Sequence, residues 1–384
     1  MVPLGIYIHF PFCRSLCTYC DFFRRTRSSA AERKALLRAL HRDIAGSAAQ
    51  IPAAARRVDS IYLGGGTPSL LTPREAQDLF DRVAASFRIE SGAEATLEVN
   101  PEVPFARLEG YRRGGWNRLS IGLQALDDRV LAGVRRRHGA ARGLECFRAA
   151  RRAGYGNVNL DLIAGLPGQD PARWPEALAS VIRLRPDHLS VYLLEMDKDT
   201  VLTRAVRAGH QRLPEEERTV AMYEQARRAL RESGYEHYEI SNFCRPGMRS
   251  RHNLKYWTDR PYLGIGPSAH GYLHGVRYRR EPDLRRYQET PVVTLPGPAS
   301  GNAAQRRARA EEAAILGLRL LEGVDLPAIE QRYRVRFAGP CGPALARVTE
   351  AGLLRWSRGR ARLTGRGLPL ANEVFEAFLS PEAA

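Results

Sequence analysis

The sequence is poor in lysine and in long apolar runs. Lysine accounts for three of its 59 basic residues, and the formal net charge is +17. No run of eighteen apolar residues is present, so we expect no membrane-spanning helix. The first thirteen residues, MVPLGIYIHFPFC, contain neither a basic region nor a cleavage site, so a secretory signal is not expected. These absences, with a hydrophobic content of 44%, predict a soluble cytoplasmic protein.

The positive charge leaves two interpretations open. One is a solvated surface with a compositional bias toward arginine. The other is an anionic partner, such as a membrane surface, porphyrin carboxylates or RNA. The arginines are spread along the chain, for example at 135–137, 277–280 and 355–367. We favour the first interpretation and expect no nucleic-acid partner.

Short β-rich segments alternate with helical patterns along the first half of the chain. Strands are predicted at 5–10, 58–63, 95–99, 117–122, 157–163 and 188–194, and a further strand at 235–240. Helical spacing occurs at 31–45 and at 73–87, and Thr72 before Pro73 is typical of a helix start. Six strand-then-helix units predict an α/β fold with a parallel sheet, specifically a partial (β/α)6 barrel.

The remainder of the chain has a different character. We expect a barrel over residues 1–240, a connecting region over 241–300 and a C-terminal helical module over 301–384. The segment 297–305, GPASGNAAQ, has the composition of a linker. The end of the chain predicts a β-wing followed by a helix, so the module is winged-helix-like.

Three of the six cysteines lie in the stretch CRSLCTYC, as Cys13, Cys17 and Cys20. This spacing differs from a paired C-x2-C zinc site. Three thiolates from one loop after a strand can hold three corners of a [4Fe–4S] cube and leave the fourth iron open. The alternatives are a zinc site completed by His9, or unrelated buried cysteines.

This CxxxCxxC motif after a first strand resembles the signature of the radical SAM superfamily. In that superfamily the open iron of the cluster chelates S-adenosylmethionine, which the reduced cluster splits to give a 5′-deoxyadenosyl radical. The loop Gly64–Ser69, GGGTPS, follows the second strand and is not a P-loop, because no Gly-Lys-Ser/Thr follows it. Its glycines let the backbone approach a ligand and offer free N–H groups.

The resemblance implies which residues contact S-adenosylmethionine. The glycine-rich loop contributes Gly65, Gly66 and Thr67, and the aromatic residue before the third cysteine is Tyr19. The other implied contacts match, one by one, positions in porphyrin-related members of the superfamily: Tyr7, Glu98, Gln124, Arg136 and Asp161. Most of these lie at or just beyond predicted strand ends, where a barrel places its chemistry.

The blocks HLSVYLLEMDKDT, EHYEISNFCRPGMRSRHNLKYW and YLGIGPSAHGY narrow the resemblance further. They are similar to the subgroup that contains oxygen-independent coproporphyrinogen III oxidase and the HemW-type heme chaperones. The oxidase typically has a fourth cysteine two residues after the third and a longer preceding segment. Here that position is Phe22, and twelve residues precede Cys13. Both features favour the chaperone type.

The segment His252-Asn253-Leu254-Lys255-Tyr256-Trp257 matches the HNxxYW motif of the chaperones, which implies a role for His252 in heme binding. Imidazole can ligate heme iron, and aromatic rings can pack on the macrocycle. A packed loop at the barrel mouth is the alternative role for this segment, and His138, His270 and Cys244 are alternative iron ligands.

The resemblance therefore implies a chaperone that binds heme, a [4Fe–4S] cluster and S-adenosylmethionine. Its heme would go to an acceptor protein, expected to be membrane-bound, and a homodimer is expected. Two alternatives stay open: oxidative decarboxylation of coproporphyrinogen III, and an RNA-modifying radical SAM enzyme.

Overall fold

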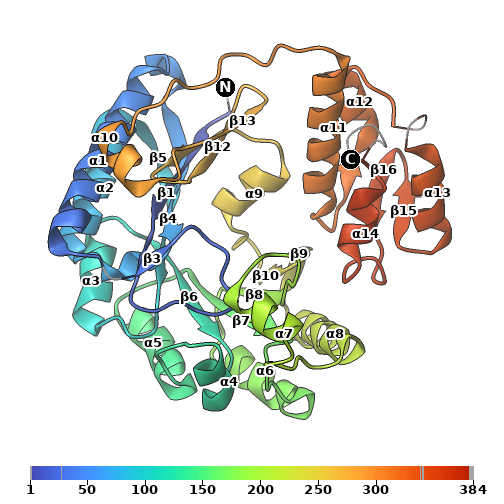
Figure 1. The fold of residues 1–384 in the computed structure, drawn as a ribbon, viewed down its shortest axis with the longest axis horizontal. Coiled ribbons are helices and arrows are strands. Elements are labelled where there is room, and N and C mark those ends of the chain that lie inside the picture. Colours follow the sequence, from blue (N-terminus) through green and yellow to red (C-terminus); the bar gives the residue numbers. More distant parts are fainter. Residues whose placement is uncertain (1, 27, 338, 340, 380–384) are drawn as a thin grey trace.

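The computed structural model describes residues 2–26, 28–337, 339 and 341–379. Its largest element is one sheet of eleven strands, in the order β13-β12-β11-β1-β4-β5-β6-β7-β8-β10-β9. Six of these strands, β1 and β4 to β8, run parallel to one another in sequence order. Figure 1 shows the sheet curved into an open barrel, with helices around its outer face. The partial (β/α)6 barrel is confirmed.

The six parallel strands match the predicted segments closely. They are β1 (Leu4–Phe10), β4 (Arg57–Gly65), β5 (Arg88–Val99), β6 (Arg118–Gln124), β7 (Val158–Ala164) and β8 (His188–Leu193). The crossover segments contain the helices α1 (Ala30–Ala49), α2 (Pro73–Ser86), α3 (Phe105–Arg113), α4 (Asp128–Gly133), α5 (Ala140–Arg152) and α6 (Trp174–Arg183). Thr72 caps α2 as predicted, in a reciprocal capping box with Glu75.

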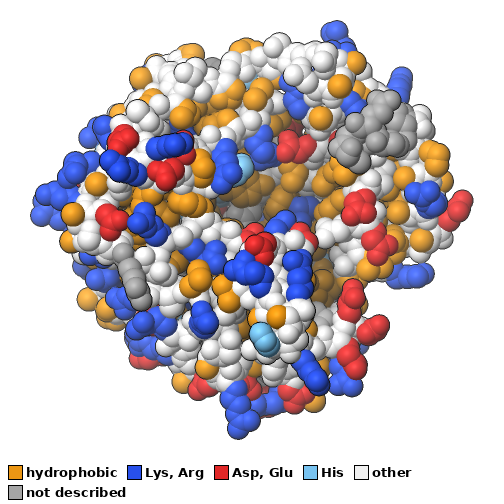
Figure 2. Space-filling view, viewed as in Figure 1, with side chains coloured by type: hydrophobic (Ala, Val, Ile, Leu, Met, Phe, Trp, Pro, Cys, Tyr) orange, Lys and Arg blue, Asp and Glu red, His pale blue; other side chains and the backbone are white. Residues whose placement is uncertain are grey.

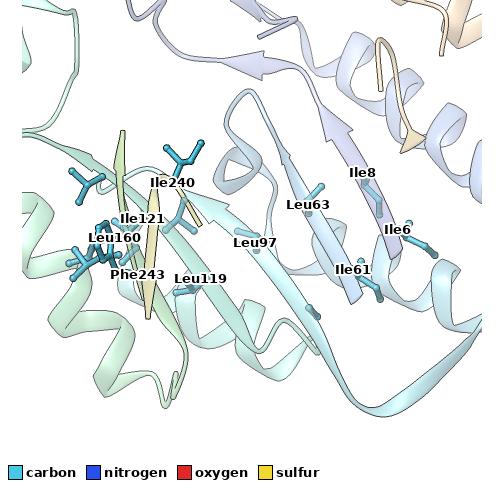
Figure 3. Packing of buried hydrophobic residues seen from close by; sticks show 14 of the residues in the cluster. Ile6, Ile8, Ile61, Leu63, Leu97, Leu119, Ile121, Leu160, Ile240 and Phe243 are labelled. Carbon is cyan, nitrogen blue, oxygen red and sulfur yellow. The ribbon is translucent and has the colours of Figure 1, made fainter. Parts of the chain in front are cut away.

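Alternation along each strand separates two environments. The outward side chains are aliphatic and pack beneath the helices (Figure 3), among them Ile6, Ile8, Ile61, Leu63, Leu97, Leu119, Ile121 and Leu160. The residues between them, such as Tyr7, Tyr62, Glu98, Ser120 and Asp161, point to the other face of the sheet. The barrel interior is therefore polar, although most of its side chains are buried or half-buried.

Residues 194–300 extend the sheet at both edges. On one side, α7 (Val201–Arg207) and α8 (Glu216–Glu232) lead to β9 (Glu236–Glu239) and β10 (Asn242–Cys244), which add antiparallel to β8. On the other side, β11 (Tyr262–Ile265) pairs parallel with β1, and the hairpin of β12 (His270–Leu273) and β13 (Val276–Arg279) follows. The helix α10 (Leu284–Glu289) packs on α1.

The helix α9 (Arg251–Trp257) carries the HNxxYW motif and packs against β4 at the barrel's amino-terminal end. Glu94 of β5 accepts hydrogen bonds from the backbone N–H groups of Arg251 and His252. The buried Lys255 pairs with Asp59 at 2.7 Å and donates to the carbonyl of Pro3. This helix closes the floor of the barrel.

The C-terminal module contains α11 (Ala303–Leu318), β14 (Val324–Asp325), α12 (Leu326–Tyr333), α13 (Gly342–Glu350), β15 (Leu354–Ser357), β16 (Arg360–Leu363) and α14 (Ala371–Glu376). The hairpin β15–β16 followed by α14 confirms the predicted wing and helix.

This module contacts both edges of the sheet. Next to β9, Leu320 forms a β-bridge with Glu239. At the other edge, Arg277 of β13 pairs with Glu312 of α11 at 2.6 Å. The module thus spans the opening that six parallel strands leave in the barrel (Figure 1). No helix among the described residues is long and apolar enough to cross a bilayer.

Candidate functional site

A pocket of about 460 Å³ lies at the carboxyl ends of the parallel strands. Its lining includes eleven residues predicted as site residues: Cys13, Cys17, Tyr19, Cys20, Gly65, Gly66, Thr67, Glu98, Gln124, Arg136 and Asp161. They come from five segments that are far apart in the sequence. The parallel topology brings them together, because it puts every strand end at the same rim.

The cysteine loop is held in place by its backbone. Its base is a short parallel pair between β2 (Phe12–Cys13) and β3 (Arg25–Thr26). Its middle is fixed at Thr18, whose N–H donates to the carbonyl of Val134 and whose carbonyl accepts from the N–H of Leu202. All three cysteines are free thiols and half-buried. Burial raises the pKa of the Cys20 thiol to about 11, which the Arg24 guanidinium opposes, so a bound metal must displace the proton.

The glycine-rich loop packs directly against the cysteine loop. The N–H of Gly66 donates to the carbonyl of Phe10, and the N–H of Thr67 donates to the carbonyl of Phe12, each at 2.8 Å. The N–H of Gly65 donates to Glu98. The prediction that this loop offers free N–H groups is therefore wrong, because all three have protein acceptors. The glycines serve close approach instead: a Cβ on Gly66 would lie 2.7 Å from the carbonyl of Pro11.

Glu98 lies near the end of β5 and is held by two donors. The hydroxyl of Tyr62 donates to its Oε1 at 2.9 Å, and the N–H of Gly65 donates to its Oε2 at 3.1 Å. Burial raises the pKa of this carboxyl to about 7, and the two hydrogen bonds only partly offset the effect. Its protonation state therefore changes near neutral pH.

Arg136 connects the cysteine loop to two strand ends. Its guanidinium donates to the carbonyl of Gly122 at 2.7 Å and to Oδ1 of Asn100 at 3.1 Å, and it lies 3.7 Å from the sulfur of Cys17. Its Nε is buried and has no hydrogen-bond partner among the described residues. A half-buried guanidinium that lines the pocket is suited to a carboxylate ligand.

Gln124 ends β6 in a left-handed backbone conformation, with φ of 69°. A register shift lies between Gly122 and Gln124, as in a β-bulge, and it turns the Gln124 side chain over Gly122 beside Arg136. Bulges of this kind re-aim side chains, and here the side chain joins the pocket lining.

Asp161 of β7 belongs to a buried polar network. It accepts from Ser120 at 3.2 Å and from the Asn159 amide at 2.7 Å. Burial raises the pKa of this carboxyl, and the hydrogen bonds oppose the rise.

Two predicted residues do not line the pocket. Tyr7 lies deeper in the barrel, where its hydroxyl is 2.9 Å from Nδ1 of His9. His252 is fully buried on α9; its Nδ1 is 3.1 Å from the hydroxyl of Ser60, and its Nε2 is 3.0 Å from that of Tyr256. In this arrangement both ring nitrogens of His252 have protein partners, and the structure does not bring it together with the other site residues.

His9 was the fourth ligand of the zinc alternative. Its ring is buried, with one nitrogen against the Tyr7 hydroxyl and the other 2.8 Å from the carbonyl of Phe23. Burial lowers the pKa of this imidazole to about 4. The ring supports the loop that follows the cysteines and offers no nitrogen to a metal.

The pocket residues that sequence reasoning missed include Tyr62, Asn100 and Ser120. Asn100 connects Thr67 to Arg136 through its amide, at 3.5 Å and 3.1 Å. Its position two residues after Glu98 at a strand end was a usable signal. Tyr62 and Ser120 lie within strands, where the only sequence signal is that their side chains fall at the positions that face the barrel interior.

Comparison with known proteins agrees with this geometry. Residues 7–181 match the radical SAM superfamily model, and residues 304–370 match the HemN C-terminal domain. The chain is 32% identical to the heme chaperone HemW of Bacillus subtilis over 97% of this chain and 98% of that protein. It is 30% identical to the heme chaperone HemW of Lactococcus lactis, over 98% and 97% respectively.

The chain belongs to the HemW family. The chain shares its fold with a porphyrin enzyme: the solved structure of coproporphyrinogen III oxidase (HemN) from Escherichia coli, a radical SAM enzyme, matches at a TM-score of 0.81 and 25% identity. That match covers 98% of this chain and 90% of the oxidase. The fold therefore identifies the scaffold, and the full-length relatives identify the HemW branch.

Proposed function

We propose that this protein binds heme and transfers it to an acceptor protein, on a scaffold that carries a [4Fe–4S] cluster and S-adenosylmethionine. The observation that carries the proposal is the end-to-end similarity to HemW chaperones. Phe22 supports it, because this residue stands where the resembling oxidases have a fourth cysteine.

Cys13, Cys17 and Cys20 would hold the cluster, and the open iron would take S-adenosylmethionine. The remaining pocket residues fit the rest of that cofactor. Glu98 would accept hydrogen bonds from ribose hydroxyls, and Arg136 would pair with the methionine carboxylate. The amino group of the cofactor needs acceptors, which Thr67 Oγ1 and the loop carbonyls supply. When bound, the cofactor supplies radical chemistry, and the protein positions it.

The acceptor would be a heme protein, and we expect a membrane-bound one. We further expect a cytoplasmic protein and a homodimer.

Oxidation of coproporphyrinogen III is the competing function, because the oxidase shares the whole fold. The deciding experiment is anaerobic reconstitution with iron and sulfide, followed by two parallel assays. In one, hemin is titrated and the absorption spectrum is followed. In the other, coproporphyrinogen III is incubated with S-adenosylmethionine and reductant.

We expect saturable hemin binding without formation of protoporphyrinogen. Protoporphyrinogen formation would identify an oxidase that works without the fourth cysteine. Absence of both hemin binding and turnover would exclude the two porphyrin functions together.

A further inference from the structure

The identity of the heme-iron ligand follows from which side chains the fold leaves accessible. This inference rests on the proposed heme binding. Four side chains were named above as candidates for the role: His252, His138, Cys244 and His270. An axial ligand must present a free nitrogen or sulfur to the heme iron, and the side chain must be accessible to a large flat macrocycle.

Three of the four do not meet this requirement. His252 is fully buried, and both its nitrogens have hydroxyl partners. His138 is 6% exposed, with Nε2 3.3 Å from the carbonyl of Leu123. Cys244 is fully buried within the sheet.

His270 is the exposed member of the group. It is the first residue of β12, on the hairpin that extends the sheet beyond β11. The hairpin ladder pairs His270 with Arg279 and Tyr272 with Arg277. Directly opposed residues of a ladder project from the same face, and so do residues two apart, so these four side chains share one face.

The contacts of these side chains show which part of the molecule this face is turned toward. Arg277 pairs with Glu312 of α11, and the hydroxyl of Tyr272 lies 3.4 Å from that of Tyr333 of α12. The face is therefore turned toward the C-terminal module. In Figure 2 the surface is hollowed near its centre, and several Lys or Arg side chains lie at the margin of the hollow.

Arg277 has a carboxylate partner, whereas Arg279, on the same face, has none among the described residues. Arg279 is exposed, its guanidinium donates to the hydroxyl of Ser268 at 2.8 Å, and no described carboxylate forms an ion pair with it. Heme combines an iron that takes imidazole with two propionate anions at its periphery. An exposed imidazole directly opposite an arginine without a carboxylate partner complements both groups.

We propose that heme binds against the β12–β13 hairpin, on the side facing the C-terminal module, with His270 as an axial ligand and Arg279 paired with a propionate. His252 then has a structural role in the barrel floor. His270 lies against Gly264 of β11, which pairs with Tyr7 of β1, the strand that leads into the cysteine loop, so heme at this place would lie on the same side of the barrel as that loop.

The test is a hemin titration of the full-length reconstituted protein and three variants. His270→Ala should weaken hemin affinity by at least about tenfold and remove the spectral signature of histidine ligation. Added imidazole should restore that signature in His270→Ala, because the free base can occupy the vacated position. Arg279→Gln should weaken affinity by about three- to tenfold while leaving the ligation spectrum unchanged.

His274→Ala is the matched control, since His274 is exposed at the turn of the same hairpin. It should behave as the unmodified protein. Unchanged affinity and spectrum in His270→Ala, with hemin binding intact in the unmodified protein, would overturn the assignment alone. Failure of the unmodified protein to bind hemin would overturn the proposed function as well.

Discussion

The hydroxyl of Tyr62 and the carboxylate of Glu98 are joined by a 2.9 Å hydrogen bond at the base of the pocket. Tyr62 lies above the buried ring of His252, with centroids 5.4 Å apart. The floor helix α9 therefore supports the strand residue that orients Glu98. This relationship connects the HNxxYW motif to the pocket without any ligand contact by His252.

The affinity for S-adenosylmethionine should fall as the pH falls through 7. Burial raises the pKa of Glu98 to about 7, so below that pH the carboxyl is protonated and accepts ribose hydroxyls less strongly. A roughly tenfold weaker affinity at pH 6 than at pH 8 is expected from one protonation. Calorimetric titration at several pH values measures it. Glu98→Gln should bind weakly at every pH, and a flat profile in the unmodified protein would contradict the role of Glu98.

Gly66→Ala should prevent assembly of the cluster. The added Cβ would lie 2.7 Å from the Pro11 carbonyl and would push the glycine-rich loop away from the cysteine loop. Iron content and absorbance after reconstitution report the result. The matched control is Gly156→Ala, where a Cβ meets no heavy atom within 4 Å. Equal iron content in both variants would show that cluster assembly does not require the close contact between the two loops.

Arg136→Lys should weaken S-adenosylmethionine binding by about tenfold, because an ammonium cannot reproduce the planar fork that contacts Gly122 and Asn100 while facing the ligand. The neighbouring Arg137→Lys is the control, since Arg137 is half exposed and pairs with Glu102. Titration of the reconstituted proteins measures both. Equal affinities would argue that Arg136 has only a structural role.

Lys255→Met should lower the free energy of unfolding by about 2–3 kcal/mol, because it leaves Asp59 without its partner in the barrel floor. Asp59 retains some solvent contact, which moderates the loss. Urea denaturation measures the change. Arg285→Met removes an exposed ion pair with Glu289 and should leave stability unchanged. Similar stability of both variants would show that the floor does not depend on this pair.

Strand positions were predictable because aliphatic side chains alternate with polar or aromatic ones, which is a period of two. On β1, Ile6 and Ile8 alternate with Tyr7 and His9, and the same alternation marks the other parallel strands. The pocket residues at strand ends were predictable for a related reason, since parallel strands all end at one rim. The expected identity of the cofactor came from the resemblance of the cysteine motif to the radical SAM signature.

Long-range pairings were not predictable from local pattern. His252 is held by Ser60, which lies 192 residues away, so its burial depends on how α9 packs into the floor. Likewise β11 pairs with β1, which is far away in the sequence, and no local signal shows that 262–279 extends the sheet. Whether the N–H groups of the glycine-rich loop are free depends on the neighbouring loop, which sequence spacing does not place.

Because α9 packs into the amino-terminal end of the barrel, ligands of the cysteine-loop pocket would enter and leave from the carboxyl ends of the strands. Two ligands that share one entrance bind in order, so the ligand that binds deepest must bind first and dissociate last. If heme lies above the cluster end, S-adenosylmethionine already in the pocket would be retained until heme leaves. The two ligands would then bind in a fixed order, and the release of heme would limit the rate at which S-adenosylmethionine is exchanged.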